Sequence, residues 1–168
     1  MALVTLHLLL AFVATLATPE LRAYALTQDG PHDGVILASA AVHHVSPFTL
    51  RALLEEESGL RPDAVNRRSG ACGAGQFTAT GRTGIERLRG RPFTCEHAMH
   101  PVHGIEAAAF LLAHLERRWG VRTAVEWYNG GKHRKSFARR VHRRAATLRA
   151  AAGMPARHHH YHRVRNES

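Results

Sequence analysis

Apolar residues recur every three or four positions over most of the chain, and this spacing places them on one face of an α-helix. Proline and glycine mark several of the ends, as at Ser46-Pro47, Gly120 and Gly153. Residues 60–81 are rich in Gly, Ser, Thr and Asn, which predicts a loop, and no segment alternates convincingly with the period of a strand. The pattern predicts a mainly α single domain with helices over residues 34–45, 47–58, 104–119, 123–128 and 134–152.

Length and composition agree with one globular domain. The chain has 168 residues, of which 45% are hydrophobic and 21% charged. A chain of this size can bury a substantial core without a metal ion. No apolar run reaches the roughly 20 residues of a membrane span, so a multispanning protein is excluded.

The first 25 residues have the features of a signal peptide. Residues 2–17 are almost all apolar, and Ala23-Tyr24-Ala25 has the small-residue pattern that signal peptidase reads. No Lys or Arg precedes the apolar run. We expect residues 1–25 to be removed and the protein to be exported, to the periplasm or to the extracellular cell wall. The alternative is a buried N-terminal helix.

The net charge of +10 comes from the C-terminal stretch. Residues 1–131 hold 12 basic and 12 acidic residues, whereas residues 132–168 hold 11 basic residues and one acid. Such a stretch attracts a polyanion, and we expect anionic wall polymers to bind residues 132–165. No aromatic residues alternate with the basic ones in the manner of a base-stacking surface, so no nucleic acid is expected. The alternative is a solvated arginine-rich helix. We assign residues 26–152 to the folded domain and residues 153–168 to a basic, His-rich flexible tail.

The cysteines and histidines predict no metal or cofactor. In an exported protein, Cys72 and Cys95 suggest a disulfide, although two buried thiols would also fit. The chain has no CxxC motif, and its glycine-rich stretch lacks the Lys-Ser/Thr of a phosphate-binding loop. The tail contains a cluster of histidines, namely His158, His159, His160 and His162. Such a cluster is compatible with metal binding, but a polar tail is the simpler interpretation.

Glu57 is the candidate for acid–base chemistry. Leu50, Leu53 and Leu54 form the apolar stripe of their helix, and Glu57 is the next member of that stripe. A carboxyl group in such a place has a raised pKa and can act as a general acid. The alternative is a solvated run of three glutamates.

Three motifs in order strengthen this interpretation. They are Glu57-Ser58-Gly59-Leu60-Arg61-Pro62-Asp63-Ala64, Gly70-Ala71-Cys72-Gly73-Ala74-Gly75-Gln76 and Trp127-Tyr128-Asn129-Gly130-Gly131. Their order resembles the SLT domain of lytic transglycosylases, over about residues 34–145. The sequence departs from the family pattern at Ala74, Gly75 and Ala79, where Leu, Met and Pro are usual.

The resemblance implies a lysozyme-like fold that cleaves the β-1,4 bond between N-acetylmuramic acid and N-acetylglucosamine in peptidoglycan and forms a 1,6-anhydro ring. Glu57 would be the single acid/base, and Tyr128 would hydrogen-bond and orient it. Gln76 would line the sugar cleft, with Ser58 and Asn129 in support. The small size resembles stand-alone forms that open the wall for a secretion or conjugation apparatus.

Two other functions remain open from the sequence. One is a lysozyme-type muramidase of the same fold, in which a residue such as Asp63 would position water. The other is a catalytically silent, basic module that binds the wall or nucleic acid.

Overall fold

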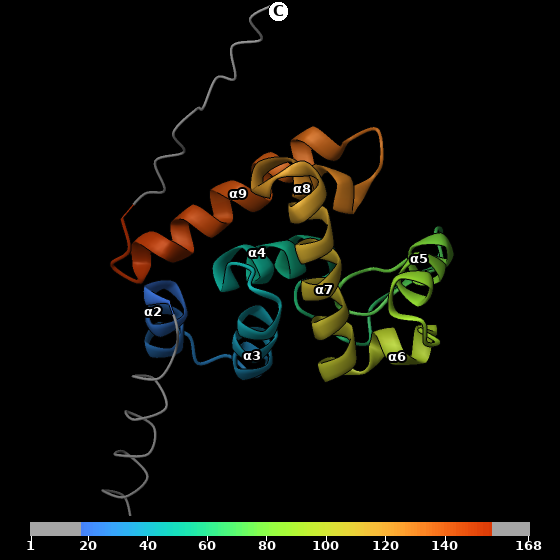
Figure 1. Ribbon diagram of the computed structural model, residues 1–168, viewed down its shortest axis with the longest axis horizontal. Helices are drawn as coiled ribbons and strands as arrows, with labels where there is room; N and C mark the ends of the chain where they lie inside the picture. The colour runs from blue at the N-terminus through green and yellow to red at the C-terminus, as the bar shows by residue number, and fades with distance from the viewer. Residues whose placement is uncertain (1–17, 156–168) are drawn as a thin grey trace, which may run out of the picture.

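The computed structural model describes residues 18–155, which form eight helices and a small antiparallel hairpin (Figure 1). In chain order the elements are α2 (Pro19–Thr27), α3 (Asp33–His43), α4 (Pro47–Ser58), β1 (Val65–Asn66), β2 (Ala71–Cys72), α5 (Ala79–Arg89), α6 (Cys95–Met99), α7 (Pro101–Trp119), α8 (Val121–Asn129) and α9 (Arg134–Ala151). None of the helices in this range is both long and apolar enough to cross a membrane. The mainly α class predicted from the periodicity is confirmed.

Helix α7 runs through the middle of the fold. It packs against α3 and α4 on one side and against α6 on the other, while α8 packs against it and α9 lies against α4 and α8 (Figure 1). Its buried face is made largely of alanines, which let the neighbouring helices approach closely. The core therefore extends on both sides of α7 rather than lying in a single layer.

Helix α4 is the most buried element near the candidate residues. Ser46 caps its N-terminus, with the side-chain oxygen accepting a hydrogen bond from the amide of Thr49 at 3.3 Å. The helix ends at Gly59, whose φ of 65° suits glycine. Apolar residues along its length are buried between α3, α7 and α9, so the position of its C-terminal turn is well determined.

Residues 60–77 are more ordered than the predicted loop. Val65 pairs with Cys72 and Asn66 with Ala71 in the antiparallel hairpin of β1 and β2. A disulfide joins Cys72 to Cys95 at the start of α6, with the two Cα atoms 5.9 Å apart. The disulfide thereby attaches the hairpin to α6. Each strand is two residues long, too short to produce an alternating pattern in the sequence.

Helix α2 bears on the predicted signal peptide. Its Tyr24 is fully buried, with its ring 5.1 Å from that of Phe48 and its hydroxyl donating a hydrogen bond to Asp33. The predicted cleavage point after Ala25 lies inside this helix, so processing there would remove Tyr24 from the core. The apolar residues 1–17 lie outside the described residues, as do residues 156–168 of the tail, and export stays a prediction.

Candidate active site

The candidate site is built where the C-terminal ends of α4 and α8 approach the turn that follows β2. Glu57 and Ser58 belong to the last turn of α4, Gln76 to the turn 73–76, and Tyr128 and Asn129 to the end of α8. Glu57 and Tyr128 are 71 positions apart in the chain, yet they lie close enough for the charge of Glu57 to raise the pKa of the Tyr128 hydroxyl. These contacts bring together the three motifs recognised in the sequence.

The three consecutive glutamates of α4 have different surroundings. Arg51 donates a hydrogen bond to Glu55 at 2.9 Å, and Arg144 of α9 donates another. Arg140 of α9 donates to Glu56 at 2.7 Å. The carboxyl group of Glu57 has no hydrogen-bond or ion-pair partner among residues 18–155, so it is the one glutamate of the run left free for chemistry.

Glu57 is half-buried, and its pKa is accordingly raised. Burial is the main cause and the charge of the neighbouring Glu56 adds to it, bringing the pKa of Glu57 from 4.5 to about 7. A group with this pKa is partly protonated at neutral pH and can both donate and accept a proton there. Glu57 has the protonation behaviour that the sequence interpretation required.

Tyr128 lies beside Glu57 but does not orient it by a hydrogen bond. Its hydroxyl donates instead to the backbone carbonyl of Gly75 at 3.2 Å. Burial and the charge of Glu57 both raise the pKa of Tyr128 well above its usual value, so the hydroxyl stays protonated. Tyr128 is therefore a donor held against the turn 73–76, which corrects the contact expected from the sequence.

Gly75 explains how the turn accommodates Tyr128. A Cβ atom added at Gly75 would lie 2.6 Å from the Tyr128 hydroxyl and 2.7 Å from the ring of Phe77. The departure from the family pattern at this position is thus matched by aromatic side chains that occupy the space of the missing side chain.

Gln76 and Ser58 both stabilise the walls of the site. The side-chain amide of Gln76 donates to the carbonyls of Ala64 and Gly73, at 3.2 and 3.0 Å, and its backbone has a φ of 48°. The hydroxyl of Ser58 is buried and donates to the carbonyl of Ala74 at 2.8 Å. In this structure both side chains bond the backbone of the loop 64–74. Backbone strain of the kind seen at Gln76 is common at functional sites.

Asn129 and Asp63 are exposed. Asn129 ends α8 immediately before Gly130, whose φ of 65° terminates the helix. Neither side chain makes a hydrogen bond within residues 18–155. Among the same residues, no group of three or more His, Cys, Asp or Glu side chains is arranged to hold a metal ion.

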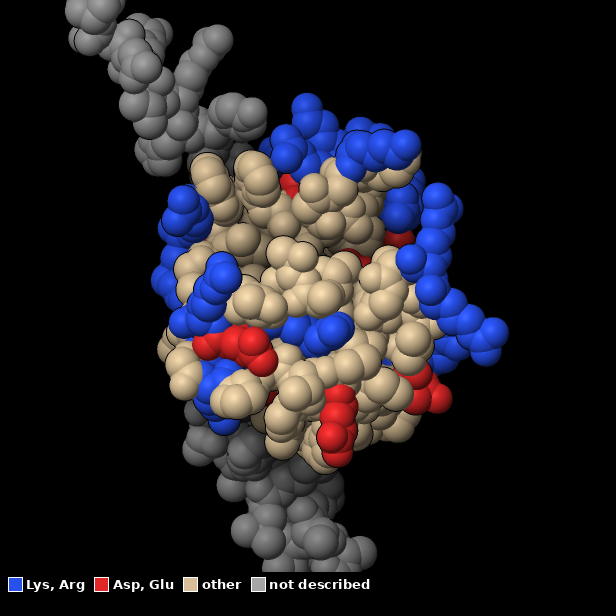
Figure 2. Space-filling view, turned by 90° about the vertical axis from the view of Figure 1, so that its right-hand side faces the viewer, with Lys and Arg blue, Asp and Glu red and all other residues tan. Residues whose placement is uncertain are grey.

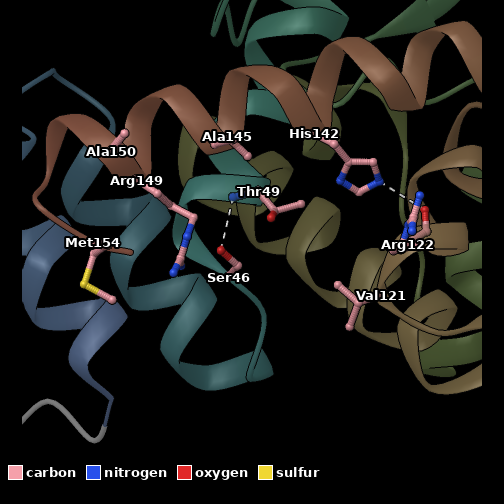
Figure 3. Close-up of a pocket in the computed structure, with 10 residues that line it drawn as sticks. Ser46, Thr49, Val121, Arg122, His142, Ala145, Arg149, Ala150 and Met154 are labelled. Atoms are coloured by element: carbon pink, nitrogen blue, oxygen red, sulfur yellow. Dashed lines mark hydrogen bonds between the residues drawn. The ribbon is translucent and has the colours of Figure 1, made fainter. Parts of the chain in front are cut away.

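A separate cavity of about 450 Å³ lies between α9 and the N-terminal end of α8 (Figure 3). His142 bonds the carbonyl of Arg122 at one end of it, and Arg149 and Met154 lie at the other. Its walls include three alanines, one valine and two arginines, and none of the candidate site residues lines it. It therefore does not change the assignment of the site to Glu57.

Comparisons with known proteins agree with this geometry. A model of the transglycosylase SLT domain family matches residues 34–149. The structure of an inactive mutant of the lytic transglycosylase Slt from Pseudomonas aeruginosa superposes with a TM-score of 0.66 and 15% identity, over 75% of this chain and 25% of that one. The chain thus spans about a quarter of that protein, and at this identity the likeness shows the fold alone.

No curated protein sequence matches the chain. The family match nevertheless covers most of its length and includes all three motifs around Glu57, Gln76 and Tyr128. On this evidence the chain belongs to the transglycosylase SLT domain family.

Proposed function

We propose that the chain is a peptidoglycan lytic transglycosylase that cleaves the β-1,4 bond between N-acetylmuramic acid and N-acetylglucosamine and leaves a 1,6-anhydro ring on the muramyl residue. The observation that carries this proposal is the unpartnered carboxyl group of Glu57, whose pKa is about 7. Membership of the SLT domain family and the fold shared with a lytic transglycosylase support the reaction class. That neighbour is an inactive mutant with one glutamate replaced by glutamine, which supports a single essential carboxyl group.

In the proposed reaction Glu57 acts twice. Its protonated carboxyl group donates a proton to the glycosidic oxygen as the bond to the muramyl C1 breaks. The resulting carboxylate then removes the proton from the muramyl C6 hydroxyl, whose oxygen bonds to C1 and closes the anhydro ring. Glu57 ends protonated as it began, and no water is consumed. The acetamido group of the substrate stabilises the cationic centre, so a second carboxylate is not required.

The other site residues assist this reaction by holding the cleft. Tyr128 and Gln76 fix the turn 73–76 beside Glu57, and Ser58 ties the end of α4 to the same loop. Asn129 is exposed at the end of α8, where a sugar hydroxyl could reach it. The muramidase alternative needs a group that positions water opposite Glu57, and the exposed Asp63 has no contact that would give it this role.

The products of digestion test the proposal. Purified peptidoglycan is incubated with the chain, and the released muropeptides are analysed by mass spectrometry. We expect products one water lighter than those of hydrolysis, because the C6 hydroxyl replaces water as the nucleophile. Products with an ordinary reducing end would establish the muramidase instead, and no release at all would refute both enzymes in favour of a silent binding module.

The pH dependence of the rate tests the electrostatic contribution of Glu56. Glu56→Gln removes a negative charge that raises the pKa of Glu57, so the pKa of Glu57 falls and its protonated form is lost at lower pH. We expect the alkaline limb of the plot of kcat/KM against pH to shift to lower pH by roughly half a unit. Glu55→Gln is the control, since Glu55 does not contribute to the pKa of Glu57. A limb that moves equally in both variants would contradict this assignment.

The proposed reaction also suggests a cellular setting. We propose an exported enzyme of the periplasm or cell wall, acting on glycan strands and serving a secretion or conjugation apparatus that needs a local opening in the wall. The basic stretch of residues 132–165 supports an enzyme held at anionic wall polymers.

A further inference from the structure

One face of α9 carries a row of arginines that the proposed reaction does not use. Ser136, Arg139, Arg140 and Arg143 line a surface hollow of about 380 Å³. Their spacing of three and four residues puts them on one face of the helix, over a length of roughly 10 Å. Figure 2 shows Lys and Arg side chains gathered along the upper edge of the molecule, where α8 and α9 lie in Figure 1.

The positive charge of this face is only partly neutralised. Residues 132–151 contain eight Lys and Arg residues and no Asp or Glu. Four of the arginines form ion pairs with glutamates of other elements, namely Arg134, Arg140, Arg144 and Arg149. Arg139 and Arg143 are exposed and have no carboxylate partner among residues 18–155, so two guanidinium groups in the hollow remain available for an external anion.

The residues of this face indicate which kind of anionic ligand it can bind. None of the large apolar residues exposed in residues 18–155 belongs to α9, so this helix has no apolar face to insert into a lipid bilayer. Phe137, which lies between these arginines in the sequence, is buried, so its ring is not available to stack on a nucleic-acid base. What the face offers is charge and hydrogen-bond donors alone.

We propose that this face of α9 binds a linear phosphodiester polymer of the cell wall. The inference rests on the proposed function, because it assumes that the chain works at the wall. Guanidinium groups bind phosphate oxygens through paired N–H donors, and the Ser136 hydroxyl adds a further donor in the same hollow. A polymer with a phosphate on every repeat suits a row of cations better than a single anion does.

The position of the row links docking to catalysis. Arg140 both lines the hollow and donates to Glu56, the neighbour of Glu57 in α4. A polymer on α9 would therefore lie close to the end of α4 that carries Glu57. Docking would raise the local concentration of substrate at Glu57, although the arginines of α9 do not themselves contact the cleaved bond.

Binding to isolated walls tests the proposal. Walls that carry a phosphodiester polymer are divided, and one half is treated with hydrofluoric acid, which hydrolyses phosphodiesters and leaves glycan and peptide. All proteins carry Glu57→Gln so that the walls stay intact. We compare this protein with the same protein also carrying Arg139→Gln and Arg143→Gln, and with a control that carries Arg67→Gln and Arg68→Gln. The control loses the same charge from two exposed arginines in the turn after β1.

We expect the α9 variant to bind untreated walls roughly 30-fold more weakly than its parent, the control to change little, and all three to bind treated walls alike. Equal losses in the α9 variant and the control would overturn the proposal, since any surface charge would then suffice. A loss by the α9 variant that persists on treated walls would assign the row to carboxylates of the peptide. The parent protein is also tested for binding to duplex DNA. If it binds DNA more tightly than untreated walls, and this binding also depends on Arg139 and Arg143, the ligand of the row is nucleic acid.

Digestion of treated walls separates this inference from the proposed function. With Glu57 intact, the α9 variant and the unmodified chain should release products from treated walls at the same rate, since these walls lack the polymer. If neither releases products, the proposed enzyme is wrong while the binding result stands. If both release products and binding is unchanged by the α9 substitutions, the enzyme stands and the docking proposal fails.

Discussion

Glu57→Gln is expected to lower the rate of glycan cleavage by roughly a thousandfold, the usual contribution of a positioned general acid–base group. Glutamine fills nearly the same space but can neither donate the proton to the glycosidic oxygen nor take one from the C6 hydroxyl. The measurement is the initial rate of muropeptide release, with Glu56→Gln as a matched neighbour that should keep most of the activity. A Glu57→Gln protein that retains a tenth of the rate would remove Glu57 from the mechanism.

The same substitution should make the protein more stable at alkaline pH. The pKa of Glu57 is 4.5 when exposed and about 7 in the fold, so the folded state binds this proton more tightly than the unfolded state does. The stability of the unmodified protein therefore falls as the pH rises from about 4.5 to about 7, by up to about 3 kcal/mol. Glu57→Gln has no such loss. The gain in its free energy of unfolding should be small at pH 5 and largest at pH 8, as measured by urea denaturation; a gain independent of pH would contradict the burial of an ionisable group.

Gly104→Ala is expected to destabilise the protein by about 3 kcal/mol or more. A Cβ atom at Gly104, in the first turn of α7, would lie 2.2 Å from the carbonyl oxygen of Ala98 in α6. A Cβ atom at Gly73 would lie 2.0 Å from the same oxygen. The glycines thus allow α7 and the turn after β2 to pack directly on the backbone of α6. Because the obstacle is backbone, no side-chain rotation can relieve the contact.

Gly84→Ala is the control, and we expect it to change the free energy of unfolding in the opposite direction. Gly84 lies inside α5, and a Cβ atom there meets no atom within 4 Å. Alanine favours a helix over glycine by up to about 1 kcal/mol, so this variant should be slightly more stable. Urea denaturation of both variants measures the difference. Two stabilised variants would mean that α6 and α7 can separate at little cost, and the close packing at Ala98 would then be without energetic importance.

The helices with a clear apolar stripe could be predicted from the sequence, and those without one could not. Residues 47–58 and 104–119 have long stripes and caps, and α4 and α7 match them closely, with α7 beginning three residues earlier at Pro101. Helix α5 is polar, contains two glycines and buries Ile85 alone, so it has no long apolar stripe. Helix α6 has five residues, too few to form a stripe. The caps Thr78 and Thr94 were the available signals for both.

The sequence placed the candidate site residues in three motifs, but it did not predict several of their contacts. Tyr128 bonds Gly75 rather than Glu57, and Gln76 bonds the backbone of its own loop rather than facing only the sugar cleft. Both differences have one cause: the turn 73–76 folds back against α6 and α8, and a side chain bonds whichever backbone carbonyl this brings close. Spacing along the chain carries no information about such distances.

By itself the sequence determined the helical class, the stripe that carries Glu57 and the family motifs around it, since these depend on residues close together in the chain. Only the tertiary structure decided which of three adjacent glutamates keeps an unpaired carboxyl group. Arg140 and Arg144 belong to α9, more than eighty residues away, and they bond Glu56 and Glu55 because α9 packs along α4. Neither arginine bonds Glu57, and burial together with the charge of Glu56 raises the pKa of its carboxyl group.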